Sequence, residues 1–391
     1  MRLSDLRGRM VLAILAVFFV AILFAIAVLS IIELVANFLF NGVFYLQWAL
    51  FQIPFTDWIF LLPANFPLAI IIGSFLVLLQ WAIGPTIIRG GLRIRTLDRE
   101  KYRWLYQEVE TLAQDAGIPM PKLALSKNPT PNAFVFGRTV KGSTLVVHQG
   151  LLESLNPREM RAVLGHELGH LGNRDIIIMT LASAVPLIAY MILQGTFEGG
   201  RVGLLAVFSG DGGDSDDAGF ACLVIIVAIF VIALLAALTY GSTLLVVRGL
   251  SRIRELYADA YSATLTKDPY SLQSALAKIT YGLSLQKKKG SGLRTFYISD
   301  PNQAVKEAAY IRSHRYQFDL DKDGVLDDRE LLQAMETEAS RHELNMVQAS
   351  LATHPPTFKR ILQLKELQAD IDMQEVLSAR EDEERISLET I

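Results

Sequence analysis

Long apolar runs alternate with polar stretches along the 391 residues of the chain. A helix needs about 20 apolar residues to cross a bilayer, and four runs approach or exceed that length: residues 10–40, 66–88, 176–193 and 220–247. The first run carries one charge, Glu33, and is too long for a signal peptide, so we expect a retained anchor. The pattern predicts a mainly α polytopic membrane protein with four transmembrane helices.

Two polar stretches, residues 89–175 and 248–391, are expected to fold together as one domain. Residues 122–125 and 143–147 are short and largely apolar, which predicts a small sheet, with Asn128–Asn132 as a loop between its strands. Helical patterns dominate elsewhere. The rest of the chain includes an expected acidic loop at 210–218 and a solvated, partly disordered acidic tail from Arg380.

Composition and charge narrow the class of protein. The chain is 51% hydrophobic and only 20% charged, which excludes a soluble, disordered or fibrous chain. A net charge of −3 provides no basic surface for nucleic acid, and a single cysteine excludes an internal disulfide.

The positions of arginine and lysine predict the orientation in the membrane. They gather in residues 2–9, 89–103 and 248–254, whereas 41–65 has none and 194–219 has only Arg201. Basic segments face the cytoplasm, so both termini are expected there. The expected boundaries are 1–88 for two spans, 89–175 for half of a cytoplasmic domain, 176–247 for two further spans, and 248–391 for the other half.

Residues 166–170, H-E-L-G-H, form a zinc-binding motif. On a helix, His166 and His170 lie on one face and can reach one metal ion, with Glu167 beside them. The preceding N-P-R-E at 156–159 is typical of a helix start with a capping box. Coincidence on a purely structural helix is the alternative.

A catalytic zinc site has three protein ligands and one open position. Glu255 is the candidate third ligand, and Asp259, one turn later, can hydrogen-bond the remaining N–H of a ligand histidine. Alternatively, the two acids form a solvated helix face paired with Arg252 and Arg254.

Four motifs carry a family resemblance: H-E-L-G-H-L-G-N-R-D, R-E-L-Y-A-D-A, P-N-A-F and T-H-P-P. Together they resemble the HtpX-type membrane metallopeptidases, relatives of the CAAX prenyl endopeptidases, over residues 1–309 and 353–364. The resemblance implies one zinc ion on His166, His170 and Glu255, with Glu167 as the base, in an α+β zincin-like (gluzincin) domain. It also implies quality control of membrane proteins during stress, in a prokaryotic inner membrane or a plasma membrane.

Two further roles follow from the resemblance. Asn132, Ala133 and Phe134 would form an edge strand that grips the substrate backbone, and His354 would act as a cleft residue that aids the transition state. From the residues alone, Asn132 after a proline is also typical of a turn. His354 before two prolines can equally end a loop and cap the next helix. Tyr257 is a second candidate for the oxyanion.

The expected chemistry is metal-assisted hydrolysis. Zinc lowers the pKa of bound water to about 7, and Glu167 takes the water's proton and returns it to the leaving amine. The third apolar run begins six residues after His170, and Glu255 lies eight residues beyond Val247. The active site is therefore expected at the cytoplasmic membrane surface, where it would cleave membrane-associated polypeptides.

Residues 319–330, D-L-D-K-D-G-V-L-D-D-R-E, fit the twelve-residue EF-hand loop, with glycine at position 6. One calcium ion is expected on five carboxylates and one backbone carbonyl, those of Asp319, Asp321, Asp323, Asp327, Glu330 and Val325. Helical patterns flank the loop at 303–318 and 329–346. The alternative is an acidic surface turn. The usual HtpX-type pattern has no such loop. A bound calcium ion would serve either as a sensor or as a structural clamp that is always occupied, and we expect it to order residues 303–350 against the cleft.

Two other functions compete with a membrane zinc endopeptidase. An intramembrane site-2 type protease needs its H-E-x-x-H within a span, yet Arg161 and Arg174 bracket the motif here. A calcium-responsive membrane scaffold with a non-catalytic zinc site would not need Glu167. The sequence names no substrate and no oligomeric state.

Overall fold

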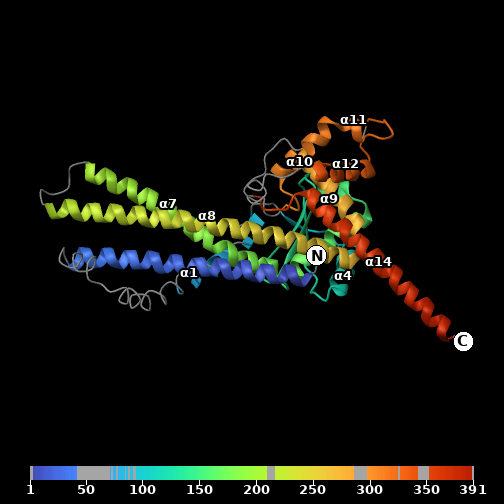
Figure 1. Ribbon diagram of the computed structural model, residues 1–391, viewed down its shortest axis with the longest axis horizontal. Coiled ribbons are helices and arrows are strands. Elements are labelled where there is room, and N and C mark those ends of the chain that lie inside the picture. Colours follow the sequence, from blue (N-terminus) through green and yellow to red (C-terminus); the bar gives the residue numbers. More distant parts are fainter. Residues whose placement is uncertain are drawn as a thin grey trace. The chain divides into compact units, whose positions relative to one another are not determined.

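The computed structural model describes residues 3–41, 71, 74–75, 78–83, 85–86, 89–90, 94–208, 216–285, 297–324, 326–341 and 352–389. These residues are mainly helical and include one small mixed sheet (Figure 1). The chain divides into two compact units, one formed by Met1–Met10, Gly84–Ile177 and Arg248–Ile391, the other by Val11–Ile83 and Ile178–Val247.

The second unit is built from the apolar parts of three long helices: α1 (Leu3–Asn41), α7 (Asp175–Phe208) and α8 (Asp216–Thr266). Within the described residues, three segments are long and apolar enough to cross a membrane: Leu6–Val28, Asp175–Arg201 and Cys222–Thr266. They overlap the predicted runs 10–40, 176–193 and 220–247. The predicted span 66–88 and the predicted acidic loop 210–218 lie largely outside the described residues.

Side chains from the three helices meet inside this unit. Phe24 of α1, Ala189 of α7 and Ala236 of α8 form a buried cluster. The amide of Gln80 also donates to the Ser183 hydroxyl, 3.0 Å away. Apolar packing thus holds the helices together, while many of their other large apolar side chains are exposed, as expected for surfaces that face lipid.

The sheet belongs to the first unit. Its strands are β1 (Arg95–Thr96), β2 (Lys122–Ser126), β3 (Ala133–Phe136) and β4 (Thr144–His148), in the order β1-β2-β4-β3. The two central strands are parallel, with Leu123 opposite Leu145, and the outer strands pair antiparallel to them. The two strands predicted from apolar runs are confirmed. β1, only two residues long, was not predicted.

The remaining helices of the first unit are α4 (Arg103–Asp115), α5 (Gln149–Ser154), α6 (Pro157–Gly172), α9 (Pro269–Ser284), α10 (Pro301–Ser313), α11 (Arg315–Phe318), α12 (Asp328–Arg341) and α14 (Thr357–Glu389). Helix α9 contacts α6, α10, α12 and α14, so it lies at the centre of this group (Figure 1). The core contains Leu105, Leu145, Leu164 and Leu276.

Two predictions about helices need correction and a third is confirmed in part. The segment 303–318 forms two helices, α10 and α11, because the chain turns at His314. The predicted helix 329–346 is confirmed as far as Arg341 by α12, and residues 342–350 lie outside the described part. The prediction of partial disorder from Arg380 is wrong, since α14 continues to Glu389. The tail lacks proline and glycine and is rich in good helix formers.

The start of α6 is the capping box predicted from the sequence. The Asn156 side chain accepts from the Glu159 N–H at 3.0 Å, and the Glu159 carboxylate accepts from the Asn156 N–H at 2.9 Å. The same carboxylate accepts hydrogen bonds from Ser274 and Lys278 of α9. Glu159 therefore both caps α6 and joins it to α9.

Glycines let α6 and α8 approach closely. A Cβ at Gly165 would lie 3.0 Å from the Ser262 hydroxyl, and one at Gly169 would lie 3.3 Å from the Ala258 Cα. The Ser262 hydroxyl donates to the Ala162 carbonyl at 2.6 Å across this contact. The close approach brings the segment of α8 that begins at Glu255 against the face of α6.

We expect Gly169→Ala to destabilise the first unit by about 1–3 kcal/mol, because the new methyl group overpacks a contact made by backbone and a ring. Gly172→Ala is the matched control, since its Cβ would meet Tyr261 atoms only at 3.5 Å or more. Thermal unfolding of both purified variants in detergent measures the difference. Equal midpoints for the two variants would contradict the close-packing argument.

Candidate active site

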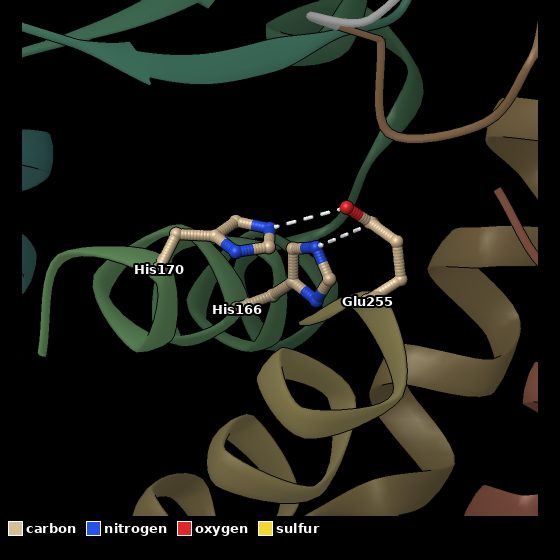
Figure 2. Close-up of side chains that lie close together, drawn as sticks. All are labelled: His166, His170 and Glu255. Carbon is tan, nitrogen blue, oxygen red and sulfur yellow. Dashed lines mark ion pairs between the residues drawn. The ribbon is translucent and has the colours of Figure 1, made fainter. Parts of the chain in front are cut away.

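His166 and His170 lie one turn apart on α6, with ring centroids 4.8 Å apart. Figure 2 shows both imidazoles and the Glu255 carboxylate of α8 turned toward one another. The His166 Nε2 lies 3.6 Å from one Glu255 oxygen, and the His170 Nε2 lies 3.7 Å from the other. These separations are too long for hydrogen bonds.

The same separations suit a shared metal ion. Two ligands on a tetrahedral zinc ion, each about 2.0–2.1 Å from it, lie about 3.4 Å apart. The three ligand atoms lie within 4.8 Å of one another, and the His166 Nε2 is buried without a hydrogen-bond partner. The two imidazoles and one carboxylate are also the donor set that zinc prefers. The residues therefore fit a zinc ion.

Each histidine is oriented by a buried carboxylate on its other ring nitrogen. Asp259 lies 2.9 Å from the His166 Nδ1, and Asp175 lies 2.6 Å from the His170 Nδ1. A carboxylate at Nδ1 favours the tautomer with its proton on Nδ1, which leaves Nε2 free to bind metal. Both rings therefore present Nε2 toward Glu255.

An arginine supports each of these carboxylates. Arg360 of α14 donates from Nε and Nη2 to the two oxygens of Asp259, each at 2.7 Å. Arg254 of α8 places its Nε 2.9 Å from Asp175. Bidentate arginine–carboxylate pairs are strong and geometrically specific. The ring orientations thus depend on segments far from α6 in the sequence.

The net charge of the cluster also suits a divalent cation. Four carboxylates, those of Glu167, Glu255, Asp259 and Asp175, are buried around the two histidines, with the guanidinium groups of Arg254 and Arg360. With neutral histidines these six groups carry a net charge of −2. Uncompensated buried charge is costly, and a zinc ion would balance it.

Protons can also neutralise the negative charge of this cluster, and so they compete with a metal ion for it. Burial opposes protonation of His166, but the carboxylates of Asp259 and Glu255 outweigh it and raise its pKa to about 9. Burial raises the pKa of Glu167, which the nearby histidines partly offset. A raised pKa makes a carboxylate a stronger base, so burial favours proton uptake by Glu167.

The structure brings His354 to the same cluster. Its Nε2 lies 4.0 Å from a Glu255 oxygen and its Nδ1 lies 3.0 Å from the Thr353 hydroxyl. Burial lowers the pKa of His354, which favours the neutral form of its ring. Arg252 donates to the Ala352 carbonyl at 2.8 Å, which holds this segment against α8.

The predicted substrate strand lies at an edge of the sheet. β3, which contains Ala133 and Phe134, pairs with β4 and forms one end of the strand order. Asn132 precedes β3 and is buried, and its side-chain oxygen accepts from the Ile298 N–H at 3.0 Å. The Asn132 side chain therefore holds the segment around Ile298 in place.

Three of the six predicted calcium ligands lie together in a second place. One oxygen each from Asp319, Asp321 and Asp323 lies within 4.8 Å of the others. Asp327 and Glu330 follow at the start of α12, and Glu330 accepts hydrogen bonds from the backbone of the loop. Val325 lies outside the described residues.

The sequence argument missed three residues of the active site. Asp175 stands five residues after His170, and Arg254 directly precedes Glu255, so both lay within recognised motifs. Arg360 lies six residues after His354, outside the motifs, and no sequence pattern indicated its role. Tyr257, the second oxyanion candidate, is buried, and its hydroxyl accepts from Arg7 at 2.7 Å.

The family model named peptidase family M48 matches residues 99–368. Among curated relatives, the protease HtpX homologue of Methanothermobacter thermautotrophicus is 36% identical over 214 residues, 55% of this chain and 73% of that protein. The homologue of Aeropyrum pernix is 41% identical over 206 residues, 52% of this chain and 60% of that protein. The homologue of Thermococcus sibiricus is 35% identical over 230 residues, 58% of this chain and 75% of that protein.

The crystal structure of S. mikatae Ste24p is a more distant likeness. Its TM-score is 0.42 at 18% sequence identity, covering 85% of this chain and 64% of that chain. A likeness at this level carries no argument about function, whereas the family model matches most of the chain, including both histidines and Glu255. The chain therefore belongs to peptidase family M48, a family of metalloproteases that hydrolyse peptide bonds.

Proposed function

We propose that this protein is a zinc-dependent endopeptidase that cleaves misfolded or membrane-associated polypeptides. The observation that carries the proposal is the convergence of the Nε2 atoms of His166 and His170 on Glu255, 3.6 and 3.7 Å from its oxygens. The carboxylates behind both histidines and the charge of the cluster support zinc at this position. The alternative, a calcium-responsive scaffold with a non-catalytic zinc site, leaves the buried Glu167 without a role.

Zinc bound there would polarise the scissile carbonyl and acidify the attacking water. Glu167 would take the proton of that water and return it to the leaving amine. Its raised pKa supports this role, because it makes the carboxylate a stronger proton acceptor. Asp259 and Asp175 would keep the two imidazoles fixed throughout.

His354 and β3 would act on the substrate. A neutral His354 whose Nε2 faces the cluster can donate a hydrogen bond to the oxygen that becomes negative during attack. As the outer strand of the described sheet, β3 can offer backbone groups to an extended peptide. Asn132 would support this strand indirectly through its contact with Ile298.

Chain distances support substrates that reach the site at the membrane. The third apolar run begins six residues after His170, and Glu255 follows Val247 by eight residues. With the arginines and lysines of residues 89–103 and 248–254, these distances favour an active site and both termini in the cytoplasm. Quality control of membrane proteins is the role that fits this access.

The proposed membrane topology predicts at which positions of the chain a fused reporter protein is active. Alkaline phosphatase, which needs an oxidising compartment, should be inactive when fused after Ile391, whereas green fluorescent protein at the same position should fluoresce. Both reporters fused within 41–65 should give the opposite result. Phosphatase activity from the C-terminal fusion would overturn the proposed topology.

Glu167→Gln should retain zinc and lose about 10²–10⁴-fold in kcat, because the amide cannot accept the proton of the attacking water. Glu255→Gln, on the neighbouring helix, should lose zinc as well as activity. Metal analysis and cleavage of a model membrane protein measure both properties. A Glu167→Gln variant that cleaves at the wild-type rate would support the scaffold alternative.

His354→Gln should lower kcat by about 10²–10³-fold while zinc content and KM stay close to those of the wild type, as expected for a donor that acts in the transition state. If His354 only ends a loop and starts α14, the substitution should lower the melting temperature and leave kcat unchanged. Steady-state kinetics beside thermal unfolding distinguish the two roles.

We also propose that calcium modulates this activity. The proposal is supported by the fit of residues 319–330 to a twelve-residue calcium loop and by the grouping of its first three aspartates. The loop departs from the pattern of the resembled family, so its role belongs to this chain rather than to the shared chemistry.

A further inference from the structure

The acidic loop contains a buried carboxylate oxygen without a partner. Asp319 is only 7% exposed, and its Oδ2 accepts from the Gly324 N–H at 2.9 Å, whereas its Oδ1 has no hydrogen-bond partner. A buried acceptor left unpaired is costly. Oxygens of Asp321 and Asp323 lie within 4.8 Å, so a cation bound there would satisfy Asp319 and relieve the repulsion among three carboxylates.

The hardness and number of these ligands favour calcium. All the described donors are carboxylate oxygens, and calcium takes six to eight oxygens in a flexible geometry, whereas magnesium demands a tight octahedron. Lys322 and Gly324 have φ angles of 63° and 86°, so the loop folds back tightly over the aspartates. This turn stands at the position where an EF-hand loop carries its glycine.

The loop and the first turn of α12 form one hydrogen-bonded piece. The Glu330 carboxylate accepts from the N–H groups of Leu320 and Asp321 across the loop, and from Asp327 within its own turn. The Asp327 side chain in turn accepts from the Glu330 N–H at 2.8 Å. Any ligand that fixes Glu330 therefore also fixes the start of α12.

A chain of ion pairs leads from that turn to the metal-binding helix. Asp328, the first residue of α12, lies 2.7 Å from the Lys278 Nζ. The same Nζ lies 2.9 Å from Glu159, which is 2% exposed in its side chain and closes the capping box of α6. Lys278 thus joins the exit of the acidic loop to the start of the helix that carries both histidines.

We propose that the carboxylates of Asp319, Asp321, Asp323, Asp327 and Glu330 form a calcium site whose occupancy stabilises the first turn of α6 through the chain Asp328–Lys278–Glu159. Asp328 is not itself a ligand position in this loop, but it stands two residues before Glu330. Calcium on Glu330 holds that turn in place, and Asp328 then stays beside Lys278. Without calcium, repulsion among the aspartates loosens the turn and weakens the pair. The inference rests on the proposed function only in taking α6 as the metal-binding helix.

The first experiment measures binding. Full-length protein in detergent is passed over a chelating resin and reloaded with zinc, because soluble calcium chelators also bind zinc. Calorimetric titration with calcium should show one site, and magnesium should bind at least about ten-fold more weakly. Glu330→Gln and Asp319→Asn should each weaken calcium binding at least about ten-fold. Failure of the wild type to bind calcium, or unchanged affinity in both variants, overturns the site.

The second experiment measures the connection by hydrogen exchange of backbone amides. Calcium should slow exchange in the first turns of α6, residues 158–163, by at least about three-fold in the wild type. Asp328→Asn should bind calcium with unchanged affinity and lose most of that slowing. Glu336→Gln is the matched control, since it removes an acid of α12 that pairs with Lys365 of α14 instead, and it should respond like the wild type.

Two results would overturn the connection. One is calcium binding in the wild type with no change in exchange at α6, and the other is an undiminished response in both Asp328→Asn and Lys278→Met. Asp328 is 60% exposed in its side chain, so its substitution is tolerated by folding even where that of Lys278 is not. Neither experiment uses peptide cleavage, so a failure of the proposed peptidase activity is read separately, from Glu167→Gln.

Discussion

The active site depends on two buried pairs, each formed by a carboxylate and the imidazole of a metal-binding histidine. A helix can place two histidines on one face, but it does not decide which ring nitrogen faces outward. Asp259 and Asp175 decide this by occupying the Nδ1 atoms of His166 and His170. Because the two acids are buried, they need cationic partners of their own, and these come from Arg360 and Arg254. The metal-binding geometry thus requires α6, α7, α8 and α14 to be assembled together.

Different interactions fix the start, the middle and the end of helix α6. Its start is capped by Asn156 and Glu159, and the latter is also paired with Lys278 of α9. Its middle packs against α8 at van der Waals distance, which the absence of a side chain at Gly169 permits. Its end is followed by Asp175, which is paired with His170. A rigid helix suits catalysis, because ligand positions need to stay within about half an ångström of the productive geometry.

Local sequence rules predicted the parts of the site that are contiguous in the chain. The capping box at 156–159, the spacing of His166 and His170, and the two central strands each depend on interactions within a few residues, so their residue types indicated them directly. The break at His314 and the helical acidic tail were not predicted correctly. The residues around His314 include no proline or glycine that would mark a turn, and the charge of the tail masked a composition rich in helix formers. Val325 and most of the span at 66–88 lie outside the described residues, and there the predictions remain predictions.

The sequence by itself determined that apolar helices accompany a polar domain, and that this domain carries an H-E-x-x-H helix and an acidic loop of calcium-binding spacing. Only the tertiary structure decided how these pieces act together. Arg360 lies 101 residues after Asp259 in the chain, yet the two side chains are paired. Lys278 pairs with Glu159, 119 residues before it, and with Asp328, 50 residues after it. Such pairs arise from packing between distant elements, for which a single sequence contains no periodicity and no spacing rule. The oriented histidines and the route from the acidic loop to α6 are therefore properties of the fold.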